Sequence, residues 1–134
     1  MKKLMTLALL SIGMFTTAQV DLKVEVTGLK SNKGQVIIGL YDSDKNFLKK
    51  TFKGNVAQIN DKKASITFLN IPKGEYAVVI FHDANTNGKL DSNFMGIPKE
   101  DYAASNNAKG FMGPPKYVDA KFKANENKTI KIKI

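Results

Sequence analysis

One nonapeptide carries side chains whose types and spacing suit a metal ion. It reads Asp83-Ala84-Asn85-Thr86-Asn87-Gly88-Lys89-Leu90-Asp91, with oxygen-bearing side chains at its first, third, fifth and ninth positions and glycine at its sixth. This is the spacing of an EF-hand calcium loop, in which alternate side chains point to one centre and a backbone carbonyl joins them at the seventh position. We therefore predict a metal site formed by Asp83, Asn85, Asn87, Asp91 and the backbone carbonyl of Lys89.

The predicted ligand set is incomplete at its twelfth position, where Phe94 stands in place of the usual bidentate glutamate. We expect weak calcium binding with a structural role, unless Asp42 or Asp44 completes the shell from outside the loop. Asp, Asn and Gly also favour tight turns, because their side chains cap backbone amides and they tolerate positive φ. An ion-free hydrogen-bonded turn is therefore the alternative interpretation.

Catalytic motifs are missing from the sequence, so we predict no catalytic residues and no enzyme activity. It contains no Gly-x-Ser-x-Gly nucleophile elbow, no Ser-x-x-Lys, no His-Glu-x-x-His and no glycine loop for phosphate. One enzymatic alternative stays open: a hydrolase of envelope or extracellular carbohydrate that uses Asp42, Asp44, His82 and Asp83. Paired glycosidase acids need carboxyl groups roughly 5–9 Å apart.

The composition excludes several classes of site. The chain has no cysteine and a single histidine, which rules out disulfides, thiolate metal sites and a zinc centre with several histidines from one chain. All 21 basic residues are lysine, so the bidentate arginine fork that reads guanine and phosphate is absent and specific nucleic-acid binding is not expected. The lysines alternate with apolar residues, which indicates solvated strand faces; weak attraction to an anionic envelope surface is the alternative.

Residues 1–18 have the pattern of a signal peptide. Lys2 and Lys3 precede an apolar run of about a dozen residues, too short for the roughly 20 of a membrane span, and small residues lead to Ala18. We predict cleavage after Ala18 and export to the periplasm or the cell exterior; an N-terminal helix packed on the domain is the alternative. Removal of two lysines leaves 19 against 12 acidic residues, so the net charge falls from +9 to +7.

Period-two alternation of apolar and polar residues is the dominant pattern in the rest of the chain. It predicts strands at 20–27, 35–41, 56–59, 63–69, 75–82, 117–124 and 128–134. We expect the first two strands to form one hairpin and the last two to form another. The stretch between them, 83–116, has no alternation and is rich in Asn, Gly, Pro and Ser, so it is predicted to be a long irregular loop.

These elements predict an all-β fold: a single antiparallel β-sandwich of about seven strands in one domain, 19–134. A closed barrel is the alternative. In the long loop, we expect the apolar side chains of Phe94, Met95, Ile97, Phe111 and Met112 to cap one end of the core. Exposed instead, the segment Phe94 to Met112 would be a surface that binds an unknown ligand or envelope partner.

Several of these segments are similar to a bacterial protein family. The stretch from Ile80 to Asp91, followed by Asn93 to Glu100 and by Ser105-Asn106-Asn107, resembles a family of small exported proteins classified as domain of unknown function 2141. The resemblance covers most of the predicted mature chain. It implies an immunoglobulin-like or prealbumin-like sandwich in the cell envelope and implies no activity.

Overall fold

The structure is a computed structural model, and it describes residues 18–89, 100–111 and 113–134. The predicted signal peptide, apart from Ala18, lies outside the described residues. Parts of the predicted metal site and of the apolar loop, residues 90–99 and 112, also lie outside them.

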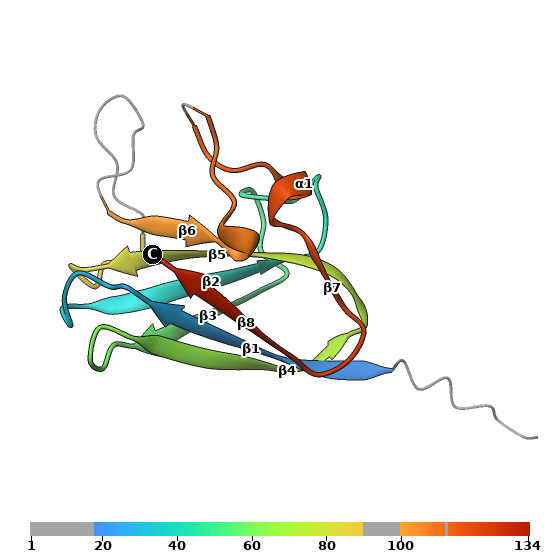
Figure 1. Cartoon of the computed structure of the whole chain (residues 1–134), viewed down its shortest axis with the longest axis horizontal. Helices are drawn as coiled ribbons and strands as arrows, with labels where there is room; N and C mark the ends of the chain where they lie inside the picture. Colours follow the sequence, from blue (N-terminus) through green and yellow to red (C-terminus); the bar gives the residue numbers. More distant parts are fainter. Residues whose placement is uncertain (1–17, 90–99, 112) are drawn as a thin grey trace, which may run out of the picture.

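Strands dominate the described chain (Figure 1). In chain order the elements are β1 (Gln19–Thr27), β2 (Gln35–Tyr41), β3 (Lys53–Gln58), β4 (Ala64–Pro72), β5 (Gly74–Asp83), β6 (Tyr102–Ala104), the 3₁₀ turn η1 (Ser105–Asn107), the single-turn helix α1 (Tyr117–Ala120), β7 (Phe122–Ala124) and β8 (Lys128–Lys133). Over 18–89, 100–111 and 113–134, no helix has both the length and the apolar character needed to cross a bilayer.

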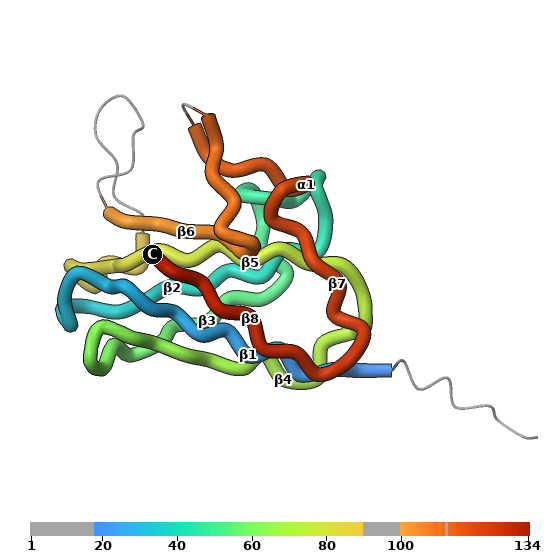
Figure 2. The backbone as a smooth tube through the Cα atoms, viewed as in Figure 1, coloured from blue at the N-terminus to red at the C-terminus, as the bar shows by residue number. Residues whose placement is uncertain are grey.

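The strands form two sheets, which confirms the predicted all-β sandwich. The smaller sheet has the order β4-β1-β8, and the larger has the order β3-β2-β5-β6, with β7 pairing the other end of β5. One pair departs from the predicted antiparallel arrangement, because β8 runs parallel to β1. The chain reaches β8 only after β7 has completed the edge of the larger sheet, so β8 enters the smaller sheet along the edge of β1 that β4 leaves open (Figure 2).

Both predicted hairpins are wrong. β1 pairs β4 and β8, whereas β2 pairs β3 and β5, so the turn between β1 and β2 crosses from one sheet to the other. At the other end of the chain, residues 117–120 form α1 instead of a strand, and β7 and β8 also belong to different sheets. A short turn can join two amphipathic strands within one sheet or carry the chain from one sheet to the other. Closeness in sequence, on which the two hairpins were predicted, does not distinguish these connections.

The core lies between the two sheets and follows the predicted alternation. Val20, Leu22, Val24 and Val26 of β1 are all buried and pack with apolar side chains of β2, β4, β5 and β8. β2 is apolar on both faces because it is central in the larger sheet, as its sequence predicts.

A second, smaller core covers the outer face of the larger sheet. It contains Phe47, Ala77, Ala104, Tyr117 and Ala120, so α1 and the segment after β2 cover this face of β5. The Phe47 ring meets the Tyr117 ring edge-on, with 5.6 Å between centroids. β5 is therefore buried on both faces along most of its length.

Candidate functional site

The candidate loop begins where β5 ends, at Asp83. β2 and β5 are antiparallel and place Asp83 opposite Gln35, the first residue of β2. The chain leaves the sheet at this point and returns to pair with β5 through β6, with Tyr102 opposite Phe81. Residues 83–101 are therefore a long excursion whose two ends lie side by side on the larger sheet.

The Asp83 carboxylate is fully buried, with 0% of the residue exposed. Its Oδ2 accepts hydrogen bonds from the Gln35 side-chain amide at 2.9 Å and from the Gly88 backbone N–H at 2.8 Å. Its Oδ1 accepts the Asn87 backbone N–H at 3.2 Å. All three of these donors are neutral, so they satisfy the oxygens without neutralising the charge.

The other predicted ligands shape the turn that follows. Asn85 Oδ1 accepts the backbone N–H of Asn87 at 3.4 Å, and Asn87 Oδ1 accepts that of Lys89 at 2.9 Å. Gly88 has φ +75°, as the sharp turn requires. Asp91, the last predicted ligand, lies outside the described residues. Within the part of the chain that the structure describes, no three Asp, Glu or His side chains gather as a metal ion would need.

Glu100 is brought to the start of the loop from its far end. Its Oε2 accepts the backbone N–H of Ala84 at 2.8 Å. Next to it, Asp101 forms an ion pair with Lys30 at 3.1 Å, which ties the returning chain to the β1–β2 turn. Neither Glu100 nor Gln35 belongs to the ligand set predicted from the sequence. Their contacts depend on strand register and loop closure, for which the local sequence has no pattern.

His82 has a structural position at the rim of the sheet. It is buried, its Nε2 lies 2.6 Å from the carbonyl oxygen of Lys33, and its backbone N–H donates to the carbonyl of Asp101 at 2.9 Å. It therefore connects the β1–β2 turn to both ends of the loop.

Gly34 allows this turn to lie directly against the loop. It has φ +73°, and a Cβ at this position would lie 2.0 Å from the carbonyl oxygen of Asp83. The backbone approach at this point leaves no room for a side chain.

Asp42 and Asp44 lie at the opposite end of β2 from Asp83. Gln35 is opposite Asp83 while Tyr41 is opposite Ala77, so the six-residue advance along β2 separates the two groups by about 20 Å. The expectation that Asp42 or Asp44 could complete the calcium shell is therefore wrong. The four side chains of the hydrolase alternative, including His82, do not converge either.

Asp42 and Asp44 instead line a separate cavity of about 800 Å³, together with Glu75, Tyr117 and three lysines. Burial raises the pKa of Tyr117 to about 12, and the hydrogen bond to Glu75 and the charges of Glu75, Asp42 and Asp44 add to this effect. Two of the lining residues, Glu75 and Lys121, form an ion pair of 3.8 Å. The tyrosine therefore stays protonated and neutral at physiological pH.

The long loop does not bury Phe111. This side chain is 95% exposed, so the prediction that it caps the core is wrong for Phe111. The positions taken by Phe94, Met95, Ile97 and Met112 lie outside the described residues. Phe47 and Tyr117 instead belong to the second core on the outer face of the larger sheet, and Tyr117 was predicted to lie in a strand.

Of three comparisons with known proteins, one gave a match. Neither the search of curated proteins nor the search of solved structures found a match. A family model matches residues 24–133, a range that includes the candidate loop, the cavity beside Tyr117 and most of the two sheets. The resemblance drawn from the sequence is confirmed, and the chain belongs to the family described as "Uncharacterized protein conserved in bacteria (DUF2141)".

Proposed function

We propose that this protein is an exported, non-enzymatic β-sandwich module in which the loop from Asp83 to Asp91 is a weak structural calcium site. The observation that carries the proposal is the fully buried Asp83 carboxylate, whose three donors are neutral. A buried charge is costly unless a counter-charge compensates it, so a cation bound at the loop would stabilise the folded state. Asn85, Asn87, the Lys89 carbonyl and Asp91 would supply the remaining oxygens.

Export is supported by the agreement between the leader pattern and the first strand. The predicted cleavage after Ala18 would leave Gln19 as the first residue, and β1 begins at Gln19. Cleavage there would keep every residue of the sandwich. Mass spectrometry of the protein from the periplasmic and culture fractions of a bacterial host tests this step, and a chain that keeps residues 1–18 in the cytosol would contradict it.

A non-enzymatic role is supported by where the polar residues lie. His82 forms hydrogen bonds that hold loops together, and the acidic pair Asp42 and Asp44 lies about 20 Å from it along β2. The only place left for the hydrolase alternative among the described residues is the cavity beside Tyr117. Glycan hydrolysis by the purified protein that is lost in Asp44→Asn would support that alternative.

Thermal unfolding with and without calcium tests the metal site. Extracellular calcium modules bind at roughly 10⁻⁴ M, so about 10 mM calcium would add about 2.7 kcal/mol and raise Tm by on the order of 10 °C. Magnesium at the same concentration should have a much smaller effect, because Mg²⁺ requires near-ideal octahedral geometry and gives up its bound water reluctantly.

Two variants distinguish a site from a general salt effect. Asn85→Ala removes one predicted ligand and leaves the three hydrogen bonds to Asp83 in place, so it should abolish most of the calcium-dependent rise. Glu126→Ala removes an exposed acid from the turn before β8 and should keep the full response. Equal Tm in calcium and in chelator would make the loop a hydrogen-bonded turn and sink the calcium proposal.

A further inference from the structure

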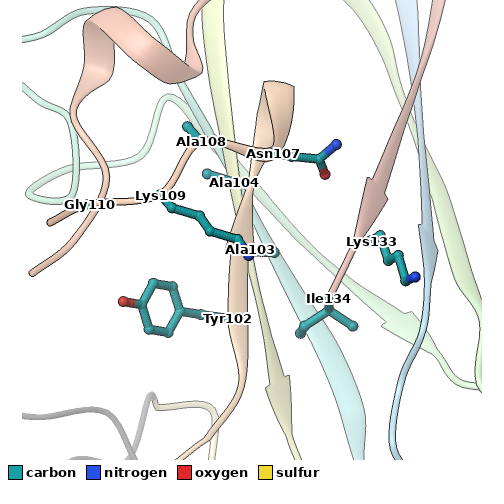
Figure 3. A pocket seen from close by; sticks show the side chains of 9 residues that line it. All are labelled: Tyr102, Ala103, Ala104, Asn107, Ala108, Lys109, Gly110, Lys133 and Ile134. Carbon is teal, nitrogen blue, oxygen red and sulfur yellow. The ribbon is translucent and has the colours of Figure 1, made fainter.

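In the described part of the chain, no strand pairs with the outer edge of β6. This edge borders a cavity of about 560 Å³ that the described residues of the candidate calcium loop do not line. β6 lies at the edge of the larger sheet, and the end of β8 lies near it across the open side of the sandwich (Figure 1). The cavity is lined by Tyr102, Ala103, Ala104, Asn107, Ala108, Lys109, Gly110, Lys133 and Ile134 (Figure 3). Its volume lies within the range of ordinary ligand sites.

The hydrogen-bond pattern of β5 and β6 determines which backbone groups face this cavity. His82 donates its N–H to the carbonyl of Asp101, so the hydrogen-bonded pairs of this antiparallel ladder are His82 with Asp101 and, two residues on, Ile80 with Ala103. Tyr102 and Ala104 therefore direct their N–H and C=O groups away from β5, toward the open edge. Unpaired edge groups of this kind are the template that an added strand uses.

Side chains along this edge are small or cationic. Ala103, Ala104 and Ala108 leave room for another backbone to approach, and Gly110 has none for a side chain of its own, since a Cβ there would lie 2.1 Å from the carbonyl of Gly113. Lys109 reaches toward β6 beside Ala103, while Lys133 lies beside β8 on the other side of β6 (Figure 3). The lining residues include two lysines and no acid, so the charge favours an anionic occupant.

We infer that this edge binds a short, extended, acidic peptide segment of a partner protein by strand addition to β6. The inference goes beyond the proposed non-enzymatic role, because it assigns a binding activity, and it does not depend on calcium. The peptide's backbone would pair with the outward groups of Tyr102 and Ala104, and its acidic side chains would face Lys109 and Lys133. Only two residues offer outward groups, so the recognised segment is about three to five residues long.

A fluorescent pentapeptide with blocked ends, Asp-Val-Thr-Val-Asp, is the direct probe, measured by fluorescence anisotropy in chelator with the full chain. Two analogues carry an N-methyl group on one of two neighbouring central residues. In a paired strand only alternate residues direct N–H groups to the partner, so one analogue should bind at least about tenfold more weakly and the other should bind like the parent. Backbone amide shifts should be confined to β6, residues 107–110 and the end of β8.

Charge variants give the second test. Lys109→Glu should lower the affinity several-fold, whereas Lys53→Glu, an exposed lysine on β3 outside this cavity, should leave it unchanged. Equal binding of both N-methyl analogues would show that charge attraction alone accounts for the interaction and would overturn strand addition. Amide shifts outside β6, residues 107–110 and the end of β8 would also overturn it, and so would the absence of saturable binding. Tighter binding of dodecanoate in competition would assign the cavity to lipid-like anions and also overturn it. Because calcium is absent, failure here is independent of the calcium proposal.

Discussion

Asp83 and Gln35 show how one strand register produces a polar contact in an enclosed position. Gln35 is the first residue of β2, and its amide reaches the buried carboxylate across the sheet at 2.9 Å. A hydrogen bond to a charged acceptor contributes more than a neutral one, and loss of a buried donor leaves the carboxylate under-satisfied. Gln35 is therefore a positioning residue for the start of the loop.

Gln35→Ala should lower the free energy of unfolding by about 1–3 kcal/mol, because one oxygen of a buried carboxylate loses a donor. Urea unfolding at neutral pH measures this loss. Gln58→Ala is the matched control, since Gln58 lies opposite Gln35 on β3 but is exposed, and its effect should stay within about 0.5 kcal/mol. Equal losses in the two variants would show that the Asp83 contact contributes nothing special.

Tyr117 predicts how stability depends on alkaline pH. Its pKa is raised from 10.0 to about 12 in the folded protein, mainly by burial and then by Glu75. The folded state therefore binds the phenolic proton more tightly than the unfolded state does. The resulting stability is fully present below about pH 10 and is lost as the pH rises toward 12.

Urea unfolding from about pH 9 to about pH 12 tests this dependence. Tyr117→Phe removes the titrating group, so the stability of this variant should fall less steeply over this interval than that of the parent. Tyr102→Phe alters a partly exposed tyrosine and should keep the parental slope. Identical slopes for the parent and Tyr117→Phe would refute the assignment.

At the scale of elements, the turn between β1 and β2 and the loop after β5 form one unit. Gly34 places the turn against Asp83, His82 contacts the Lys33 carbonyl, and Lys30 pairs with Asp101. The contacts come from segments about 50 to 70 residues apart in the chain. The loop after β5 is therefore held by contacts with the β1–β2 turn as well as by hydrogen bonds within its own turn.

Two glycines with similar backbone angles separate packing from conformational strain. Gly34→Ala meets both a positive φ and the Asp83 carbonyl, so it should destabilise the protein by about 3 to 5 kcal/mol. Gly88→Ala meets the same kind of φ with nothing within 4 Å and should cost only about 1 to 2 kcal/mol. Thermal or urea unfolding of both variants gives the comparison, and a larger loss for Gly88→Ala would contradict the close approach at Gly34.

The edge of the larger sheet is another composite element. β6 and β7 pair opposite ends of β5, and Ser105 bridges the gap between them. Its buried hydroxyl accepts the Val78 backbone N–H at 3.0 Å and donates to the Ala120 carbonyl at 2.5 Å. Side-chain hydrogen bonding replaces the ladder where the chain turns through η1, so buried backbone groups remain satisfied.

At the scale of the whole molecule, the two sheets are joined by connections that the predicted hairpins do not describe. β1 and β2 are neighbours in sequence yet lie in different sheets, and β8 closes the smaller sheet from the other end of the chain. The lysines of β8 are exposed to solvent, whereas Ile132 is buried between the two sheets, as the alternation predicts. The positive charge that β8 carries therefore lies on its solvated side.

The candidate site was likewise predicted only in part from the sequence. The types and spacing of Asp83, Asn85, Asn87 and Gly88 predict a tightly curled polar loop, and the turn hydrogen bonds to Asp83 and Asn87 have that form. Nothing in the local pattern indicates that Gln35 and Glu100 reach the loop, because their contacts depend on the pairing of β2 with β5 and of β5 with β6. Spacing alone likewise left Asp42 available to the loop until strand direction placed it at the other end of β2.

The amino-acid sequence by itself determined most of the strands and which of their faces are buried, because side-chain alternation is a local property of the extended backbone. It missed β6, which lies within the predicted loop 83–116, and it predicted a strand at 117–120, where α1 forms. It also determined the leader pattern, the absence of cysteine chemistry and the family resemblance. Tertiary structure alone decided which strands pair, that β8 runs parallel to β1, and which polar groups meet Asp83. Pairing is a competition among many edges with similar patterns, and its outcome depends on packing across the whole core, which no local window contains.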